Sequence, residues 1–404
     1  MKPALCILLC LTLLCGCVSK PSETQSSFSF AETETITPDP TAATPEITVP
    51  ETQSVLAEND PAVTAFDPMS IAAAMTLEEK VGQLFLAACP NENALEDLQT
   101  YHLGGYLLFG KDFDGETPAS LSETISSWQS ASSIPMLIAV DEEGGTVCRV
   151  SSHSAFRSKR FSSPRTLYNK GGLELVLSTE EEKCLLLRSL GINVNLAPVC
   201  DVTTDPSAFM YKRSLGEIPE TTGVFAAAMV EVMNAHQIGS VLKHFPGYGN
   251  NTDTHTGIAV DSRSLQSLTE NDLIPFAAGI AAGCGAILIS HTIVECLDSE
   301  YPASLSPAVH EFLREEMEFT GVVVTDDLTM DAITKLYGSS EAAVLAVLAG
   351  NDLLCTSDYQ TQYRAVVQAV LNGRIPMEQV DQAVCRILQW KYDLGLLDNL
   401  TNYT

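Results

Sequence analysis

Two histidines, a lysine and an aspartate gather in one glycine-rich segment, KHFPGYGNNTDTHTGIAV, which runs from Lys243 to Val260. Pro246, Gly247 and Gly249 interrupt any helix or strand, so the segment is predicted to be a loop. These residue types on one loop are compatible with a metal site, an acid/base site or a polar surface loop. Residues elsewhere in the chain have to decide between the three.

Asp253 and His255 are the pair in this loop that is suited to proton transfer. A carboxylate two residues from a histidine can orient the imidazole and raise its basicity, which makes a general acid/base dyad. By frequency alone, a histidine that is simply hydrogen-bonded within a loop is the more common case. The spacing is therefore a candidate that needs support from other motifs.

A second candidate is the sequence VVVTDDLTM, in which Asp326 and Asp327 follow a buried apolar run. Neighbouring side chains on a strand point in opposite directions, so only one of the two is expected to face the site. A carboxylate in this place can attack a sugar carbon with oxocarbenium character. The structural alternative is that Asp327 caps the helix that follows.

Several hydrogen-bonding side chains could bind a sugar. In VDEEGGTVCRV, Asp141 and Arg149 flank two glycines, which allow the backbone to approach a ligand closely, although a plain turn explains the glycines equally well. Arg213 in YKRSLG, together with Lys243 and His244, adds donors that suit a neutral, hydroxyl-rich ligand.

The elements that must position these residues follow a repeating pattern of apolar runs and helical segments. The runs are VGQLFLAA from Val81, LGGYLLFG from Leu103, PMLIAVDEEGG from Pro135, INVNLAPVCDV from Ile192, IGSVLKHF from Ile238, CGAILISHT from Cys284, GVVVTDD from Gly321 and GNDLLCTSD from Gly350. Continuous apolar runs are typical of parallel strands buried on both faces. Eight strand–helix repeats predict an α/β fold, a (β/α)8 TIM barrel, whose site lies at the carboxyl ends of the strands. A doubly wound open sheet is the alternative, although it more often has fewer strands.

The amino-terminal part of the chain is expected to lie outside the barrel. Residues 1–17, MKPALCILLCLTLLCGC, have the charge and apolar length of a signal peptide, and their end resembles a lipobox in which Cys17 is lipidated. An ordinary secretion signal is the alternative. Residues 18–65 are rich in Thr, Ser, Pro and Glu and are predicted to be a disordered linker. Residues 66–404 are expected to form a single catalytic domain.

Composition excludes some classes of partner. The chain has 22 lysines and arginines against 51 acidic residues, a formal net charge of −29, so nucleic acid is a poor partner. The cysteines form no CxxC pair, and no metal or other cofactor is expected. A metal-dependent amidohydrolase barrel is disfavoured because the first strand, FLAACP, offers no histidine.

Taken together, the motifs resemble those of family 3 glycoside hydrolases, in particular the single-domain β-N-acetylhexosaminidases. KHFPGYGNNTDTH, VDEEGGTVCR, NLAPVCDV, KRSLG and VVVTDDLTM occur in the family's order and spacing, between about Met75 and Leu397. The resemblance implies a TIM barrel with Asp326 as nucleophile, His255 as acid/base and Asp253 as its dyad partner. It also implies that an N-acetylglucosamine unit is bound by Asp141, Arg149, Arg213, Lys243 and His244. Tyr248 departs from the motif, since many relatives have a second histidine there, and a local change in packing or hydrogen bonding is expected.

The sequence therefore predicts an exported, lipid-anchored, extracytoplasmic enzyme. It is expected to hydrolyse terminal non-reducing N-acetylglucosamine from peptidoglycan fragments or related glycans by a retaining double displacement. A phosphorylase is one alternative, since a neutral histidine does not repel incoming phosphate as a carboxylate does. A non-catalytic sugar-binding lipoprotein is the other, and loss of the nucleophile or the dyad would have favoured it. The oligomeric state is not indicated by the sequence.

Overall fold

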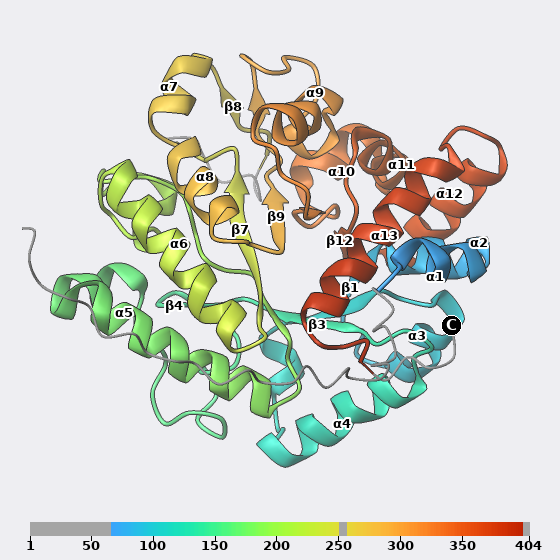
Figure 1. Ribbon diagram of the computed structural model, residues 1–404, viewed down its shortest axis with the longest axis horizontal. Coiled ribbons are helices and arrows are strands. Elements are labelled where there is room, and N and C mark those ends of the chain that lie inside the picture. The colour runs from blue at the N-terminus through green and yellow to red at the C-terminus, as the bar shows by residue number, and fades with distance from the viewer. Residues whose placement is uncertain (1–65, 250–256, 399–404) are drawn as a thin grey trace, which may run out of the picture. The chain divides into compact units, whose positions relative to one another are not determined.

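The computed structural model describes residues 66–249 and 257–398 (Figure 1). Its main sheet contains eight parallel strands, and each lies within one of the apolar runs that predicted it. They are β1 (Phe85–Ala88), β2 (Gly105–Leu108), β3 (Leu137–Val140), β6 (Val194–Asn195), β7 (Gly239–Phe245), β9 (Ala286–Ile289), β11 (Val322–Thr325) and β12 (Leu354–Thr356). Most of them are buried along their whole length, as expected for strands covered on both faces.

The strand order defines a barrel. The strands pair in the order β11-β9-β7-β6-β3-β2-β1-β12, and every pair is parallel. A parallel bridge between Val324 of β11 and Leu353, beside β12, joins the two ends of this order. The predicted (β/α)8 barrel is thus confirmed.

Helices follow the strands and lie outside them (Figure 1). They are α1 (Pro68–Ala74), α2 (Leu77–Gln83), α3 (Ala94–Tyr101), α4 (Pro118–Ala131), α5 (Pro164–Ser189), α6 (Pro219–Ala235), α7 (Leu265–Glu270), α8 (Leu273–Ala281), α9 (Pro307–Glu311), α10 (Asp331–Tyr337), α11 (Ser339–Ala349), α12 (Tyr359–Leu371) and α13 (Met377–Asp393). Helix α5 is kinked at Gly171 and Gly172, where the backbone leaves helical geometry. Across the described stretches no single helix is long and apolar enough to cross a membrane, and α10 with α11, bent by 104°, reaches that length and apolarity only as a pair.

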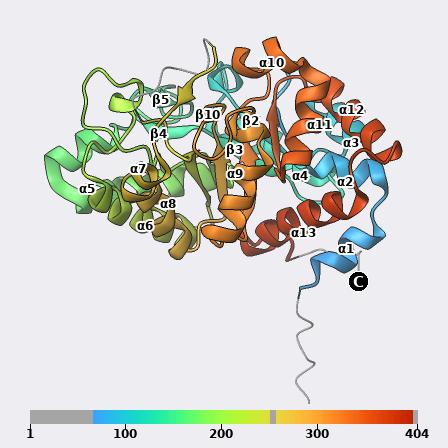
Figure 2. The same cartoon turned by 90° about the horizontal axis from the view of Figure 1, so that it is seen from above.

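Two small sheets lie at the end of the barrel opposite α1 and α13 (Figure 2). Strands β4 (Glu142–Gly144) and β5 (Val147–Cys148) are antiparallel and directly follow β3. Strands β8 (Val260–Asp261) and β10 (Ile293–Val294) are parallel and lie in the segments that follow β7 and β9. These additions therefore extend the carboxyl ends of the barrel strands.

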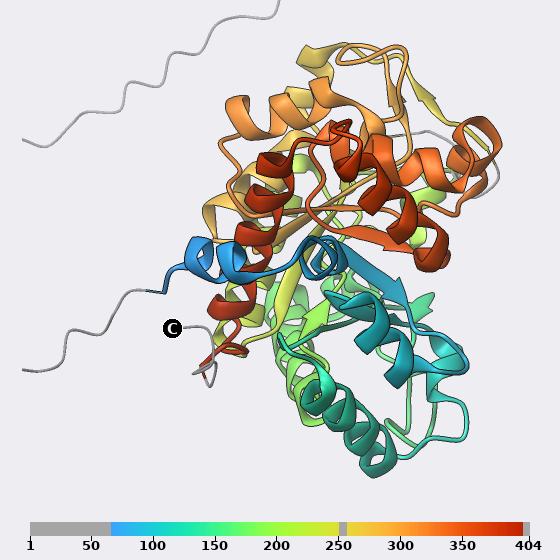
Figure 3. The ribbon, with the colours of Figure 1, turned by 90° about the vertical axis from the view of Figure 1, so that its right-hand side faces the viewer.

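Helices α1 and α2 precede the first barrel strand and pack against α12 and α13. A capping box opens α2: the Thr76 hydroxyl accepts from the Glu79 N–H, and the Glu79 carboxylate accepts from the Thr76 N–H. Helix α1 packs against the carboxyl-terminal helix α13 (Figure 3). The cysteines of the described residues are free thiols, and six of them are buried.

Candidate active site

A cavity of about 310 Å³ opens at the carboxyl ends of the barrel strands. Six of the residues predicted to bind or attack a sugar line it: Asp141, Arg149, Arg213, Lys243, His244 and Asp326. They come from segments far apart in the chain, which β3, β7 and β11 bring to one end of the barrel. Asp253 and His255, predicted as the acid/base dyad, lie outside the described residues, as does Cys17.

Lys243 lies at the centre of a buried ion-pair network. Its Nζ is 2.6 Å from Asp141 Oδ1 and 2.6 Å from Glu143 Oε1, and only 3% of its side chain is exposed. Burial alone would lower the pKa of Lys243, but the two carboxylates outweigh that effect and raise it. The ammonium is therefore charged and fixed in the cavity wall.

Glu143 receives a second cation from Arg213. The guanidinium donates from Nε to Glu143 Oε2 at 3.0 Å and from Nη2 to Oε1 at 2.6 Å. Burial raises the pKa of Glu143, but Lys243 and Arg213 together hold that pKa well below its usual range. Glu143 thus serves as the shared counter-ion of two side chains that line the cavity.

His244 is oriented from both sides of its ring. Its Nδ1 is 2.8 Å from Asp201 Oδ2, and its Nε2 is 3.2 Å from Nη2 of Arg213. Because a guanidinium can only donate, Nε2 accepts and the proton is on Nδ1, which donates to Asp201. This assigns His244 as a neutral imidazole held between a cation and a carboxylate.

Lys243 and His244 are neighbours in the chain, yet both line the cavity. Side chains alternate along a regular strand, but the register of β7 against β9 shifts between Leu242 and Phe245. Such an irregularity changes the direction of a side chain. Two successive residues can therefore serve the same site.

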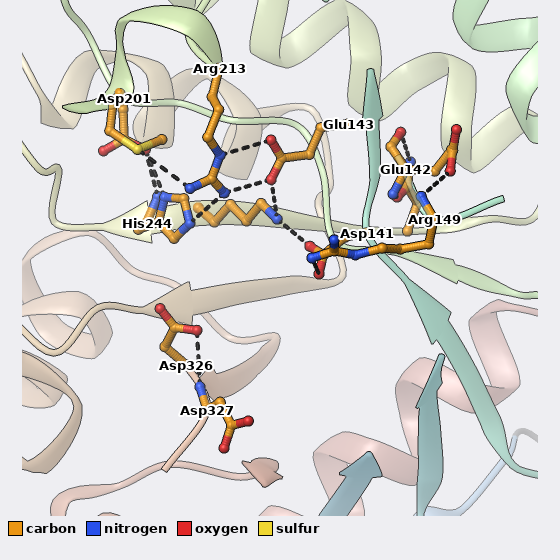
Figure 4. Close-up of polar contacts among 12 residues, drawn as sticks. Asp141, Glu142, Glu143, Arg149, Asp201, Arg213, His244, Asp326 and Asp327 are labelled. Carbon is orange, nitrogen blue, oxygen red and sulfur yellow. Dashed lines mark hydrogen bonds and ion pairs between the residues drawn. The ribbon is translucent and has the colours of Figure 1, made fainter. Parts of the chain in front are cut away.

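Asp326 lies across the cavity from the ion-pair network (Figure 4). It follows β11, and its Oδ1 accepts a hydrogen bond of 2.9 Å from the N–H of Asp327. The two aspartate side chains point in opposite directions, as expected, and that of Asp326 is directed towards the network (Figure 4). Both residues contribute to the lining of the cavity.

The alternative interpretation, in which Asp327 caps the helix that follows, is wrong. Its Oδ1 accepts from the N–H and the hydroxyl of Thr329, at 2.8 and 2.7 Å, which stabilises the turn before α10. The residue at the N-cap position of α10 is Met330. Asp327 therefore shapes the wall of the cavity beside Asp326.

The segment that carries Arg149 is supported by Glu142, which is fully buried. Glu142 Oε2 accepts from the N–H groups of Arg149 and Val150, each at 2.8 Å, and Oε1 accepts from the hydroxyl of Ser151. The Arg149 guanidinium then lies 3.7 Å from Asp141 Oδ2. One carboxylate thus holds the backbone that places Arg149 beside Asp141.

Tyr248, the residue that departs from the family motif, lies beside His244 in the cavity wall. Its ring meets the ring of His244 edge-on, with centroids 5.2 Å apart, and also packs against Phe209. Its backbone N–H donates to Asp201 Oδ1 at 2.7 Å. Tyr248 therefore helps to fix both His244 and the carboxylate that orients it.

Three residues of this site had no role in the sequence prediction: Glu142, Glu143 and Asp201. Glu142 and Glu143 directly follow Asp141, and the charged run was the available signal. Asp201 lies near the end of the apolar run that begins at Ile192, and this position at a strand end was the available signal. Among the described residues, no group of three or more His, Cys, Asp or Glu side chains is arranged to hold a metal ion.

Comparison with protein families identifies the class to which this barrel and site belong. Residues 76–390 match the model described as the glycosyl hydrolase family 3 N terminal domain, which covers most of the chain. The chain belongs to glycosyl hydrolase family 3, as its motifs had indicated, and the prediction of a glycoside hydrolase is confirmed.

Individual relatives refine that class. The chain is 31% identical over 342 residues to the protein named Beta-hexosaminidase LpqI of Mycobacterium tuberculosis, an alignment that covers 80% of this chain and 85% of the relative. The solved structure of M. tuberculosis LpqI matches with a TM-score of 0.73 at 29% identity, covering 81% of this chain and 96% of that one. A family 3 β-N-acetylglucosaminidase from Paenibacillus sp. FPU-7 matches with a TM-score of 0.75 at 31% identity, and this chain covers 63% of its length. These relatives agree with the β-N-acetylhexosaminidase type that the motifs indicated.

Proposed function

We propose that this chain is a retaining β-N-acetylhexosaminidase that removes a terminal, non-reducing N-acetylglucosamine unit from a glycan. The observation that carries the proposal is one cavity that holds the Asp326 carboxylate opposite the network of Asp141, Lys243, Arg213 and His244. The network offers fixed donors and acceptors for sugar hydroxyls. The activities named for the relatives support N-acetylglucosamine as the sugar.

In the proposed first step, Asp326 attacks the anomeric carbon of the bound sugar. A bond forms between a carboxylate oxygen and that carbon while the bond to the leaving oxygen breaks. His255, oriented by Asp253, donates a proton to the leaving oxygen, so the leaving group departs as a neutral alcohol.

In the second step, water releases the sugar. His255, now neutral, takes a proton from the water as its oxygen attacks the anomeric carbon, and the Asp326 carboxylate leaves. The anomeric carbon is inverted twice, so the product has the β configuration of the substrate. Asp141, Arg149, Arg213, Lys243 and His244 bind the sugar throughout, and no step needs a cofactor.

The test is the substitution Asp326→Ala, assayed on an aryl N-acetyl-β-glucosaminide. We expect kcat to fall on the order of 10⁴-fold. Added azide should partly restore turnover and give the α-glycosyl azide, since it replaces the missing nucleophile. Asp331→Ala is the matched control, because Asp331 is an exposed aspartate that pairs with Lys335 nearby. Near-normal activity of Asp326→Ala excludes this residue as the nucleophile.

The same assay separates hydrolysis from phosphorolysis. Phosphate should neither accelerate release nor give N-acetylglucosamine 1-phosphate. A phosphate-dependent rate with that product would instead favour the phosphorylase that the sequence left open. Binding without turnover in the unaltered protein would favour the non-catalytic sugar-binding alternative.

We also propose that residues 1–17 form a lipoprotein signal peptide and residues 18–65 a linker, so that Cys17 anchors the enzyme outside the cytoplasm. The substrate would then be a glycan of the cell envelope, such as a peptidoglycan fragment. The substitution Cys17→Ser should move the protein from the membrane fraction to the soluble fraction. Cys15→Ser, two residues away, is the control and should leave the fractionation unchanged.

A further inference from the structure

A second cavity, of about 650 Å³, adjoins the active-site cavity. Phe109 and Asp327 line both cavities. The walls of the second one come from the segments that follow β1, β2 and β12, including Asn91, Lys111 and Gln360. Since these segments leave the carboxyl ends of their strands, both cavities open on the same end of the barrel.

The cation in this cavity is fully engaged. The three N–H bonds of the Lys111 ammonium have three acceptors: the Cys89 carbonyl at 2.7 Å, Asn91 Oδ1 at 2.7 Å and Asp112 Oδ1 at 3.1 Å. Lys111 therefore connects the segment after β1 to the segment after β2. It has no N–H left for an anionic ligand, and Asp112 compensates its charge.

The remaining charged groups of the cavity are carboxylates. Asp327 Oδ2 accepts from Ser357 at 3.1 Å, and Asp358 Oδ2 accepts from Ser339 at 2.6 Å. A carboxylate has about four lone-pair sites, so both can accept further hydrogen bonds. The lining thus offers acceptors and net negative charge, which suits a ligand rich in hydroxyl donors and free of negative charge.

The residues at the junction of the two cavities are suited to bind two linked sugar units. Phe109 is half-buried, with the Arg149 guanidinium 5.8 Å from its ring centroid, and presents apolar surface at the junction. Asp327 follows the proposed nucleophile in the chain and lines both cavities, so the second cavity adjoins the one in which the anomeric carbon would react. An enzyme that removes a terminal non-reducing unit binds nothing beyond that unit on its non-reducing side. A contiguous sugar subsite must therefore receive the leaving group.

We propose that this second cavity binds the sugar unit on the leaving-group side of the scissile bond, and that it takes an uncharged pyranose such as a second N-acetylglucosamine. A sugar that carries a free carboxylate would meet Asp327 and Asp358, and the cation in the lining of this cavity, Lys111, already has three acceptors. The inference rests on the proposed function and specifies the substrate class for the same site.

The first test compares a substrate that fills the subsite with one that does not. N,N′-diacetylchitobiose has a sugar as its leaving group, whereas N-acetyl-β-glucosaminyl fluoride has a single atom. Gln360→Trp places an indole in the second cavity, and Gln368→Trp places one on the exposed surface of the same helix, away from it. In Gln360→Trp the ratio of kcat/KM for the disaccharide to that for the fluoride should fall about tenfold or more, because binding energy from the second sugar is lost. In Gln368→Trp the ratio should be unchanged.

Two outcomes of that test contradict the inference. If Gln360→Trp changes both substrates equally, or changes neither, the cavity is not a leaving-group subsite. If the unaltered enzyme hydrolyses neither substrate, the proposed function itself fails, which is a separate result.

The second test addresses charge. At low ionic strength the unaltered enzyme should prefer diacetylchitobiose to the β-1,4-linked disaccharide whose reducing unit is N-acetylmuramic acid with a free carboxylate. Asp358→Asn keeps an acceptor for Ser339 but removes a charge, and should raise relative use of the acidic substrate by about threefold or more. Equal use of both substrates by the unaltered enzyme, or no change in Asp358→Asn, contradicts the preference for an uncharged unit.

Discussion

The ammonium of Lys243 lies 2.6 Å from both Asp141 Oδ1 and Glu143 Oε1, so one side chain of β7 contacts two carboxylates that follow β3. The contact joins neighbouring parts of the cavity wall, and all three side chains are largely buried. Breaking a buried ion pair is costly because the remaining charge has no compensation. Lys243 is therefore expected to support both the fold and the binding of the sugar.

The substitution Lys243→Met should lower the free energy of unfolding by about 3–5 kcal/mol and abolish measurable turnover. Urea unfolding and kcat/KM on an aryl N-acetyl-β-glucosaminide measure the two effects. Lys212→Met is the control, because Lys212 is exposed and lies next to Arg213 in the chain. An unfolding free energy within about 0.5 kcal/mol of the unaltered protein would show that the network does not stabilise the fold.

Glu142 provides a test of positioning. Its carboxylate accepts from the N–H groups of Arg149 and Val150, and an amide at this place would direct an NH₂ group towards donors. In Glu142→Gln we expect KM to rise about tenfold, with a smaller change in kcat, since Arg149 loses its placement beside Asp141. The free energy of unfolding should fall by about 1–3 kcal/mol.

Glu181→Gln is the matched control for this substitution, because the Glu181 side chain is 60% exposed. A loss of stability in Glu142→Gln with unchanged KM would mean that Glu142 supports the fold without placing Arg149. That outcome would remove it from the positioning residues of the site.

The barrel could be predicted because a strand that is buried on both faces has a continuous apolar sequence. GYLL, LIAV and VVVT, for example, are the sequences of β2, β3 and β11, and all of their residues are buried. The ends of strands follow less simple rules. β11 ends at Thr325, so the sequence does not show that Asp327 stabilises the turn after the strand through Thr329.

The pairing within the site could not be predicted in the same way. Lys243 and Asp141 are 102 residues apart, and Arg213 and Glu143 are 70 apart. The sequence shows that each is charged and near a strand end, but the network depends on which strands are neighbours and on the direction of each side chain. A buried counter-ion such as Glu143 cannot be told from an exposed glutamate until those neighbours are known.

Lys391 of α13 is a lysine that is fully buried. Its Nζ donates to Gln83 Oε1 at 2.7 Å, and burial lowers the pKa of Lys391 to about 7. In the unfolded chain a lysine has a pKa of about 10.4. Below the folded pKa the protein must bury a charged ammonium. Between the two values the unfolded state binds more protons, so the free energy of unfolding should rise with pH.

For the unaltered protein that rise should approach about 1.4 kcal/mol per pH unit between pH 7 and 10, added to the contributions of other groups. Lys391→Met removes this contribution but leaves Gln83 Oε1 without its donor. The difference in free energy of unfolding between the two proteins should therefore favour Lys391→Met most near pH 6. This difference should shrink as the pH rises. Urea unfolding of both proteins at several pH values measures the difference, with Lys335→Met, exposed on α10, as the control. If the difference between Lys391→Met and the unaltered protein does not vary with pH, Lys391 keeps the same protonation in the folded and unfolded states.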